Sequence, residues 1–265
     1  MLQDIQYLIF ISIIIITSII VLKLKILNFK GTISSIFMGN LVYLVTGIGG
    51  FILVIEFFII GFIGTKFRFK QKRKKGLAQE KDGIRSWENV LANGFAFSLF
   101  GTIYHYTNNE LFLFAFIASI AIATGDTLAT EIGLLSSNKP KLITNFKDVE
   151  AGKSGGITIL GIFASIIGII IIIISSLVIG FVLNYYSIFA IIIGSFVGIL
   201  IDSIIGATIQ AQYYCVDCKK YSELQYHHKK KNELTKGYSF IDNNIVNLLS
   251  TTIGSVLSIL IIIIF

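Results

Sequence analysis

Long apolar runs, separated by short polar segments, make up most of this chain. Eight of these runs approach the roughly 20 residues that a helix needs to cross a bilayer. They cover residues 5–22, 31–46, 48–65, 88–105, 110–128, 156–182, 187–210 and 244–264. A helix satisfies its own backbone hydrogen bonds, which hydrocarbon cannot do. The pattern therefore predicts an all-α, polytopic membrane helix bundle of about eight transmembrane helices, forming one transmembrane domain over residues 1–265.

The basic residues predict the orientation of this bundle. All 22 Lys and Arg residues fall in the loops after the first, third, fifth and seventh runs. Lysine and arginine accumulate in cytosolic loops, so these loops should face the cytosol and both termini the outside. The formal net charge of +7 then reflects topology and contact with membrane lipids rather than nucleic-acid binding. We expect a multi-pass protein of the cell membrane.

Asp126 and Glu131 lie at the end of the fifth run, where an ionised carboxylate costs several kcal/mol, roughly, unless it is paired or bound to a metal. Both are candidate ligands of a divalent cation. Their spacing places them about 140° apart around a regular helix. They can share one ion only if the helix breaks near Gly125 or Gly133; otherwise a single ligand is expected, with Asp126 the first choice. Thr130 shares the helix face of Asp126.

A basic, glycine-containing loop follows and ends immediately before the sixth run. Backbone N–H groups and a lysine at a helix N-terminus form a site for anions. The triplet at residues 152–154 is not part of a P-loop, because Lys147 stands where that motif requires glycine. The candidate phosphate-binding residues in this loop are Lys141, Lys153, Gly155 and Gly156. Carboxylates beside such a loop point to phosphoryl chemistry at a membrane surface, on the cytosolic side.

The seventh run carries a row of residues spaced by four: Gly194, Gly198, Asp202, Gly206 and Gln210. Close packing against a neighbouring helix explains the glycines. It does not explain Asp202, which needs a partner or an ion. We therefore interpret Asp202 as a further candidate ligand of an ion and Gln210 as a candidate binding residue.

Polar side chains also gather where the fourth and eighth runs begin. Ordinary capping by Ser86 and interfacial anchoring by Trp87 could account for part of the first group. The alternative is recognition of a phosphate, a nucleotide or a polar head group, by forked cations and amides. The candidates are Arg85, Asn89, Asn93, Asn243, Asn244 and Asn247.

The loop after the seventh run carries a second candidate metal site. Cys215 and Cys218 have the spacing of zinc ligands, and His227 and His228 follow in the same loop. A disulfide is not expected in the reducing cytosol. The alternatives are a small zinc knuckle over residues 215–231 and a loop with exposed thiols.

Four ordered sets of motifs resemble the domain-of-unknown-function-92 membrane family. They are GDTLATEIG at 125–133, PKLIT at 140–144 with VxxGxxGG at 149–156, DSxxGATxQ at 202–210 and DNNxVN at 242–247. The resemblance extends from about residue 31 over most of the chain. Some prokaryotic members carry an insertion like the Cys-containing loop, with a further cysteine where this chain has His228.

The family includes phytyl-phosphate kinases of plants and cyanobacteria. The resemblance implies that a nucleoside triphosphate, CTP, phosphorylates an isoprenoid lipid phosphate such as phytyl or geranylgeranyl phosphate. It implies Mg²⁺ on Asp126, with Asp202 or Glu131, and Lys153 on the transferred phosphate. Asp126, Lys153 and Asp202 are thus the expected catalytic residues. A lipid-phosphate cytidylyltransferase and a transporter with an intramembrane carboxylate site are the alternatives.

Overall fold

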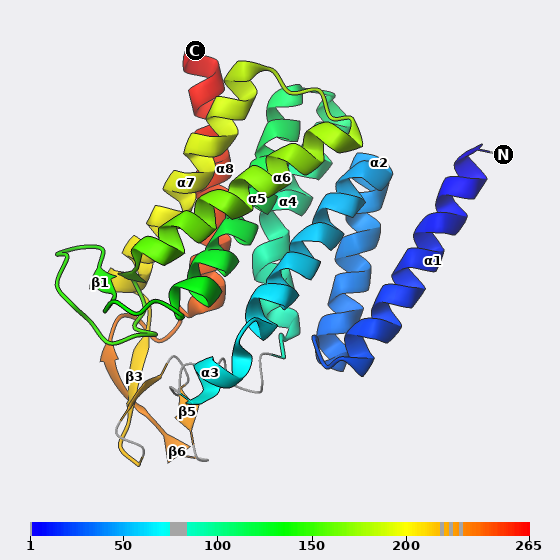
Figure 1. The fold of residues 1–265 in the computed structure, drawn as a ribbon. Coiled ribbons are helices and arrows are strands. Elements are labelled where there is room, and N and C mark those ends of the chain that lie inside the picture. The colour runs from blue at the N-terminus through cyan, green and yellow to red at the C-terminus, as the bar shows by residue number, and fades with distance from the viewer. Residues whose placement is uncertain (1, 75–83, 218–219, 223–224, 228–229) are drawn as a thin grey trace.

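The computed structural model describes residues 2–74, 84–217, 220–222, 225–227 and 230–265. The apolar runs form long helices that pack side by side, so the predicted polytopic membrane helix bundle is confirmed (Figure 1). In this described part of the chain, five helices are long and apolar enough to cross a membrane. These are α2 (Phe29–Lys66), α5 (Glu110–Gly133), α6 (Ile159–Ile179), α7 (Tyr185–Thr208) and α8 (Asn243–Ile264).

Two further long helices lie in the same bundle. Helix α1 (Leu2–Lys23) packs on α2 through Phe10, whose ring stacks on Tyr43 with the ring centroids 3.8 Å apart. Helix α4 (Trp87–Thr107) lies between α2 and α8 and contacts both. It is less apolar than its neighbours because Glu88 and two asparagines occupy its first two turns.

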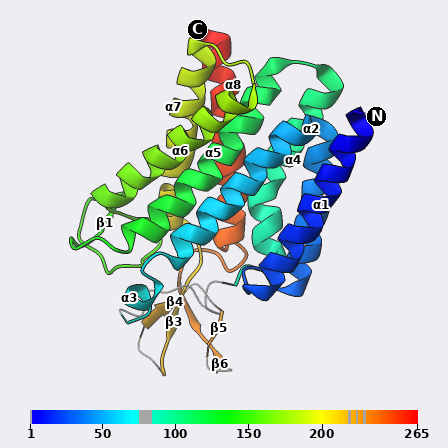
Figure 2. The ribbon, with the colours of Figure 1, turned by 45° about the vertical axis from the view of Figure 1, so that its right-hand side comes forward.

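Helix α2 is a hairpin of two antiparallel arms. A straight helix of its 38 residues would be about 57 Å long, far more than a bilayer core of about 30 Å. The chain reverses at Gly47, whose φ of 69° is readily adopted only by glycine. Gly31 and Gly61, from opposite arms, both lie against Arg85. The two arms are visible in Figure 2 and correspond to the predicted runs 31–46 and 48–65.

Helix α5 is the centre of the bundle and contacts α2, α4, α6, α7 and α8. Every residue from Leu113 to Gly125 is buried. Alanine, serine and glycine alternate with Ile and Phe in this stretch, which lets neighbouring backbones approach closely. Asp126 therefore follows directly after the most enclosed segment that the structure describes.

The polar loops gather at one end of the bundle, opposite both chain termini (Figures 1 and 2). Short strands that the sequence did not predict form there, together with the short helix α3 (Phe69–Lys74). The strands are β1 (Lys141–Leu142), β2 (Gly156–Ile157), β3 (Gln212–Cys215), β4 (Lys220–Ser222), β5 (Tyr226–His227), β6 (Lys230–Lys231) and β7 (Glu233–Lys236).

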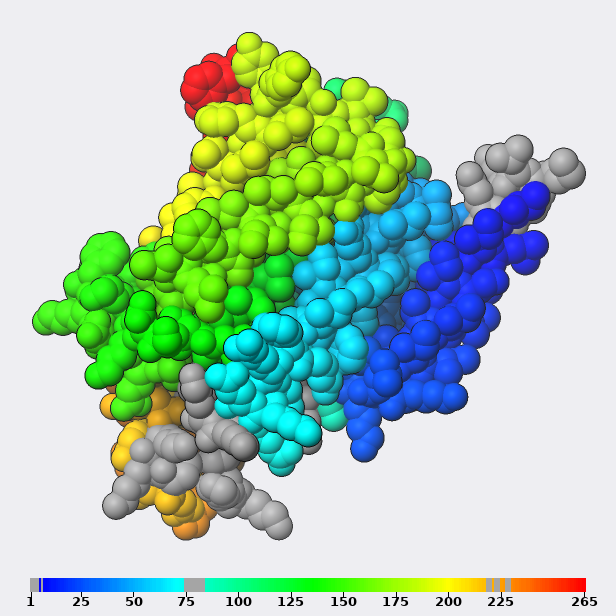
Figure 3. Space-filling view, in the orientation of Figure 1, coloured from blue at the N-terminus to red at the C-terminus, as the bar shows by residue number. Residues whose placement is uncertain are grey.

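The strands pair antiparallel as β1 with β2, β5 with β6, and β4-β3-β7. In space-filling view the loop between α5 and α6 and the strand region project beyond the helices (Figure 3). The helices thus carry the apolar core, and the strands form a small cap on one end.

Candidate functional site

Helices α7 and α8 approach each other closely toward the strand end of the bundle, and one side chain of α5 fits between them. Ile122 of α5 reaches between Gly198 of α7 and Gly254 of α8, where added Cβ atoms would lie 3.1 and 2.6 Å from its Cδ1. The chain order makes α5 and α7 parallel to each other and antiparallel to α8 (Figure 1). The predicted close packing of the glycine row on α7 is therefore observed, against both α5 and α8.

One helical turn closer to the strand end, the same three faces carry Asp126, Asp202 and Ser250, since residues four apart lie one above the other. Ser250 Oγ donates a hydrogen bond of 3.0 Å to Asp202 Oδ2. The side-chain amide of Asn247 is oriented so that its nitrogen donates to the same oxygen at 3.2 Å and to the Asn243 carbonyl at 3.2 Å. Both aspartates are half-buried. The periodicity of the helices thus places the two carboxylates on facing helices, although they are far apart in the sequence.

Arg85 faces this layer from the side of α2. Its backbone pairs with residues 26–28, and its guanidinium lies against Gly61, where a Cβ atom would be 3.2 Å from both Nη atoms. Burial lowers the pKa of Arg85 from its usual value, while the charges of Glu131 and Asp126 raise it. The charges of Glu131 and Asp126 therefore help to keep the half-buried Arg85 protonated.

Glu131 has a different environment from Asp126. Its Oε2 forms an ion pair of 2.5 Å with Lys72 Nζ, and its Oε1 accepts a hydrogen bond of 3.1 Å from Thr65. The side chains of Lys72 and Glu131 are only 1% and 2% exposed. Helix α5 continues without a break to Gly133, so Asp126 and Glu131 point in different directions.

Lys72 was missed by the sequence reasoning, because it lies in a basic run that positive-inside anchoring explains. Only its burial separates it from the exposed lysines around it. Ser250 was also missed, although a polar residue three positions after Asn247 is a natural partner for Asp202. Among the described residues, no three His, Cys, Asp or Glu side chains come close enough to hold a metal ion.

The asparagines at the starts of α4 and α8 join these two helices. Asn89 Oδ1 accepts a hydrogen bond from Ser86 N at 3.1 Å, and Asn89 Nδ2 donates to Asn244 Oδ1 at 2.6 Å. Asn93 donates to the Asn89 carbonyl at 2.9 Å. Helix capping therefore explains the hydrogen bond between Asn89 and Ser86, but it does not explain the hydrogen bond from Asn89 to Asn244 of α8. Asn243 is the exposed first residue of α8.

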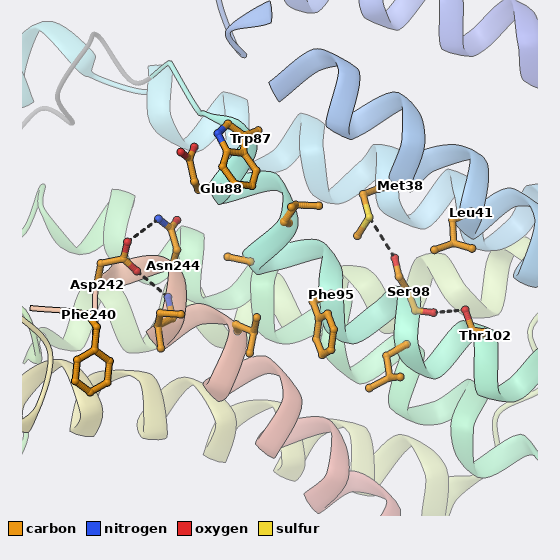
Figure 4. A pocket seen from close by; sticks show the side chains of 15 residues that line it. Met38, Leu41, Trp87, Glu88, Phe95, Ser98, Thr102, Phe240, Asp242 and Asn244 are labelled. Carbon is orange, nitrogen blue, oxygen red and sulfur yellow. Dashed lines mark hydrogen bonds between the residues drawn. The ribbon is translucent and has the colours of Figure 1, made fainter. Parts of the chain in front are cut away.

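Two hollows flank α4. A small cavity of about 60 Å³ is lined at its polar end by Arg85, Asn89 and Asn93. A larger groove of about 690 Å³ follows the opposite side of α4, between α2 and α8 (Figure 4). Asn244 lies at the polar end of this groove, beside Asp242.

The loop between α5 and α6 packs on the last turns of α7. Gly155, at φ of 80°, approaches so closely that an added Cβ would be 2.4 Å from Ala207 N. Lys153 Nζ lies 5.9 Å from the ring centroid of Tyr221 in β4, so its ammonium faces the strand cap. Lys141 is exposed and bonds Asp148 at 3.1 Å.

The remaining candidates are spread around this end of the bundle. Gly156 belongs to β2, Thr130 is exposed on α5, and Gln210 is buried where α7 passes into the strand cap. Cys215 is buried at the end of β3. Cys218, His228 and the side chain of His227 lie outside the described residues, so the zinc site stays a prediction.

Comparison with known proteins gives a family and several relatives. The family described as integral membrane protein DUF92 matches residues 12–255. An uncharacterized membrane protein of Methanocaldococcus jannaschii is 31% identical over 255 residues, or 95% of this chain and 93% of the relative. Chloroplastic protein VTE6 of Arabidopsis thaliana is 25% identical over 88% of this chain and 65% of its own length. Protein PGR of the same plant is 29% identical over 89% of each chain. No solved structure matches.

Proposed function

Because this chain belongs to the DUF92 family of integral membrane proteins, we propose that it is a membrane-embedded kinase acting on prenyl monophosphates. The donor in this proposal is CTP. The acceptor is an isoprenoid lipid phosphate such as phytyl or geranylgeranyl phosphate, and the product is the diphosphate. The motifs shared with the phytyl-phosphate kinases of the family support this substrate class.

The placement of Asp126 and Asp202 at matching positions of packed helices carries the proposal. Two half-buried aspartates on facing helices are expensive in a membrane bundle and mark a functional site. Arg85 supplies a cation beside Asp126 that can bind a phosphate in a forked geometry. This combination, at the end of the bundle that carries the polar loops, favours chemistry on a phosphorylated lipid at the membrane surface.

The donor atoms in this layer fit Mg²⁺. Magnesium prefers oxygen ligands and is commonly held by one or two carboxylates together with substrate phosphates. Asp126 and Asp202 would hold it here. Glu131 is a weaker candidate, because both of its oxygens are already bonded, to Lys72 and Thr65. When bound, the ion would neutralise charge on the transferring phosphate.

In the proposed reaction an oxygen of the acceptor phosphate attacks the γ-phosphorus of CTP. The new P–O bond forms as the bond to the β–γ bridging oxygen breaks, and CDP leaves with the electron pair. A phosphate monoester has a second pKa near 6, so the acceptor is largely a dianion at neutral pH and needs no strong base. The chain's task is therefore to position the two substrates and to balance their charge.

We assign the positioning to side chains from several elements. Arg85 and the amides around it would bind the acceptor head group, and Lys153, with the glycine loop, would bind the nucleotide phosphates once its ammonium turns from Tyr221. The full binding set in the proposal is Arg85, Asn89, Asn93, Thr130, Lys141, Gly155, Gly156, Gln210, Asn243, Asn244 and Asn247.

The proposed orientation places the strand cap and the active site in the cytosol. Counting the two arms of α2 separately gives eight crossings, with both chain termini outside. The confinement of lysine and arginine to alternate loops supports this arrangement, and so does the position of both termini opposite the strand cap (Figure 2). The proposed location is the cell membrane.

A reaction with defined products tests the function. Purified protein is incubated with Mg²⁺, CTP and geranylgeranyl or phytyl phosphate, and both products are identified by mass. The proposal expects the prenyl diphosphate and CDP. A CMP-linked lipid with pyrophosphate would instead identify a cytidylyltransferase. Absence of any phosphorylated lipid product with all common nucleoside triphosphates would refute the kinase.

A further inference from the structure

The groove along α4 has an apolar floor that continues for most of the helix. Leu91, Phe95 and Leu99 succeed one another at four-residue spacing and are 37%, 45% and 37% exposed. Met38 of α2 and Leu248 of α8 stand on the two sides. Figure 4 shows Phe95 in the floor between Trp87 at one end and Thr102 at the other.

The dimensions of the groove suit one long chain. From Trp87 to Thr102 the floor extends about 22 Å, at 1.5 Å per helical residue. The volume of about 690 Å³ lies within the range of sites for single small molecules, about 300–1,000 Å³. A diacyl lipid would have to place a second chain outside it. A short prenyl chain would leave much of the floor uncovered.

Only one end of the groove is joined to the candidate site. Asn244 lines that end and is bonded to Asn89, and one turn further along α8 Asn247 bonds Asp202. At the other end the Thr102 hydroxyl donates to the Ser98 carbonyl at 2.7 Å. Glu88 and Asp242 also line the Asn244 end. This end is therefore polar and fits a head group, and the far end suits the tip of a hydrocarbon chain.

We infer that this groove binds the isoprenoid chain of the acceptor and that its length selects the number of isoprene units. The inference rests on the proposed function and adds a substrate subsite to it. The phosphate lies by Asn244 and Asn89, and Asn89 also lines the small cavity of Arg85 on the other side of α4. The chain runs along Leu91, Phe95 and Leu99. Because the surrounding lipid is equally apolar, selection depends on how well the chain fits the floor rather than on removal from water.

Bulky substitutions at two depths test this length selection. Leu99→Trp fills the far part of the groove, Leu91→Trp fills the part near the head group, and Leu44→Trp, on a 68% exposed residue of α2 outside the groove, is the matched control. The substrates are geranylgeranyl phosphate and geranyl phosphate, which has half the chain length.

Leu99→Trp should lower kcat/KM for geranylgeranyl phosphate about tenfold or more and leave geranyl phosphate within about twofold. Leu91→Trp should impair both substrates, and Leu44→Trp neither. Equal loss for both substrates in well-folded Leu99→Trp, or no loss for either, would overturn the inference. Thermal unfolding in detergent checks that each variant folds.

A binding measurement separates this inference from the proposed kinase. Geranylgeranyl phosphate with a diazirine at the tip of its chain is photolysed with the protein without nucleotide, and the adducts are mapped. Adducts at residues 98–102 that survive excess phosphatidic acid support binding of the prenyl chain in the groove. If such adducts form but no diphosphate is made, the proposed kinase activity is refuted and the groove inference stands. Adducts only at other residues, or loss of the 98–102 adducts in excess phosphatidic acid, would overturn the inferred chain-binding role of the groove. Neither result would contradict a measured kinase activity.

Discussion

At the scale of single residues, two acids on one helix take different roles. Asp126 is half-buried and interacts electrostatically with Arg85, whereas Glu131 forms an ion pair with Lys72. A regular helix turns about 100° per residue, so five positions separate the two faces widely. The same side-chain chemistry therefore serves a candidate reaction centre in one case and an ion pair in the other.

Asp126→Asn and Asp202→Asn should each lower the turnover of prenyl phosphate at least about a hundredfold, because each removes charge from the proposed phosphoryl-transfer site. Glu110→Gln is the matched control, since this exposed acid lies at the opposite end of the same helix as Asp126. Near-normal activity in well-folded Asp126→Asn would show that the catalytic centre is not at Asp126 and Asp202. Activity is measured from the diphosphate formed.

Lys72 and Glu131 should be coupled energetically. Lys72→Met or Glu131→Gln alone leaves a buried group without its charged partner, with an expected loss of about 3–5 kcal/mol in the free energy of unfolding. The double variant should recover a large part of the loss. Denaturant unfolding of all four proteins measures the coupling, and strictly additive losses would contradict it.

At the scale of elements, the loop between α5 and α6 is fixed by the contact of one glycine with α7. Gly155→Ala forces a side chain into a left-handed backbone and onto Ala207, so steric overpacking of about 1–3 kcal/mol adds to the backbone strain. Gly180→Ala is the control, because Gly180 also has positive φ but open space around it. Thermal unfolding should separate the two variants. Equal melting temperatures would show that the loop is not held there.

The zinc hypothesis concerns the strand cap and can be tested by metal analysis. Zinc bound by Cys215, Cys218 and one or both of His227 and His228 should copurify with the protein in near-equimolar amount and fall strongly in Cys215→Ser/Cys218→Ser. Metal analysis after dialysis gives the answer. Equal zinc content in the wild type and the double variant would refute the zinc site. The strand cap would then be stabilised without zinc, by the pairing of β3 with its neighbouring strands.

At the scale of the whole molecule, the strands in the described part of the chain lie at one end and both chain termini at the other. If the strand end is cytosolic, cysteines replacing the exposed Lys147 and Lys231 should be protected from an impermeant reagent outside intact cells. A cysteine replacing Asn108, between α4 and α5, should react. The background carries Cys215→Ser and Cys218→Ser. Labelling at 147 and 231 but not at 108 would show that the orientation is the reverse of the proposed one.

The site was predictable in part. Acids and amides in an apolar sequence are costly, so Asp126, Asp202 and the asparagines stood out from composition alone. The sequence could not distinguish Lys72 from the other basic residues of its loop. Nor could it say that Glu131 is paired or that Asn89 bonds Asn244, because these contacts join segments that are distant in the chain.

By itself, the sequence determined the helices, their approximate ends and the membrane environment, since these depend on local properties: runs of apolar side chains and backbone hydrogen bonding within one segment. The tertiary structure decided which polar groups meet. That depends on the hairpin of α2 at Gly47, on the burial of α5 among five other helices, and on the glycines that let α5, α7 and α8 approach. Packing of this kind is a property of several segments at once, and no single segment encodes it.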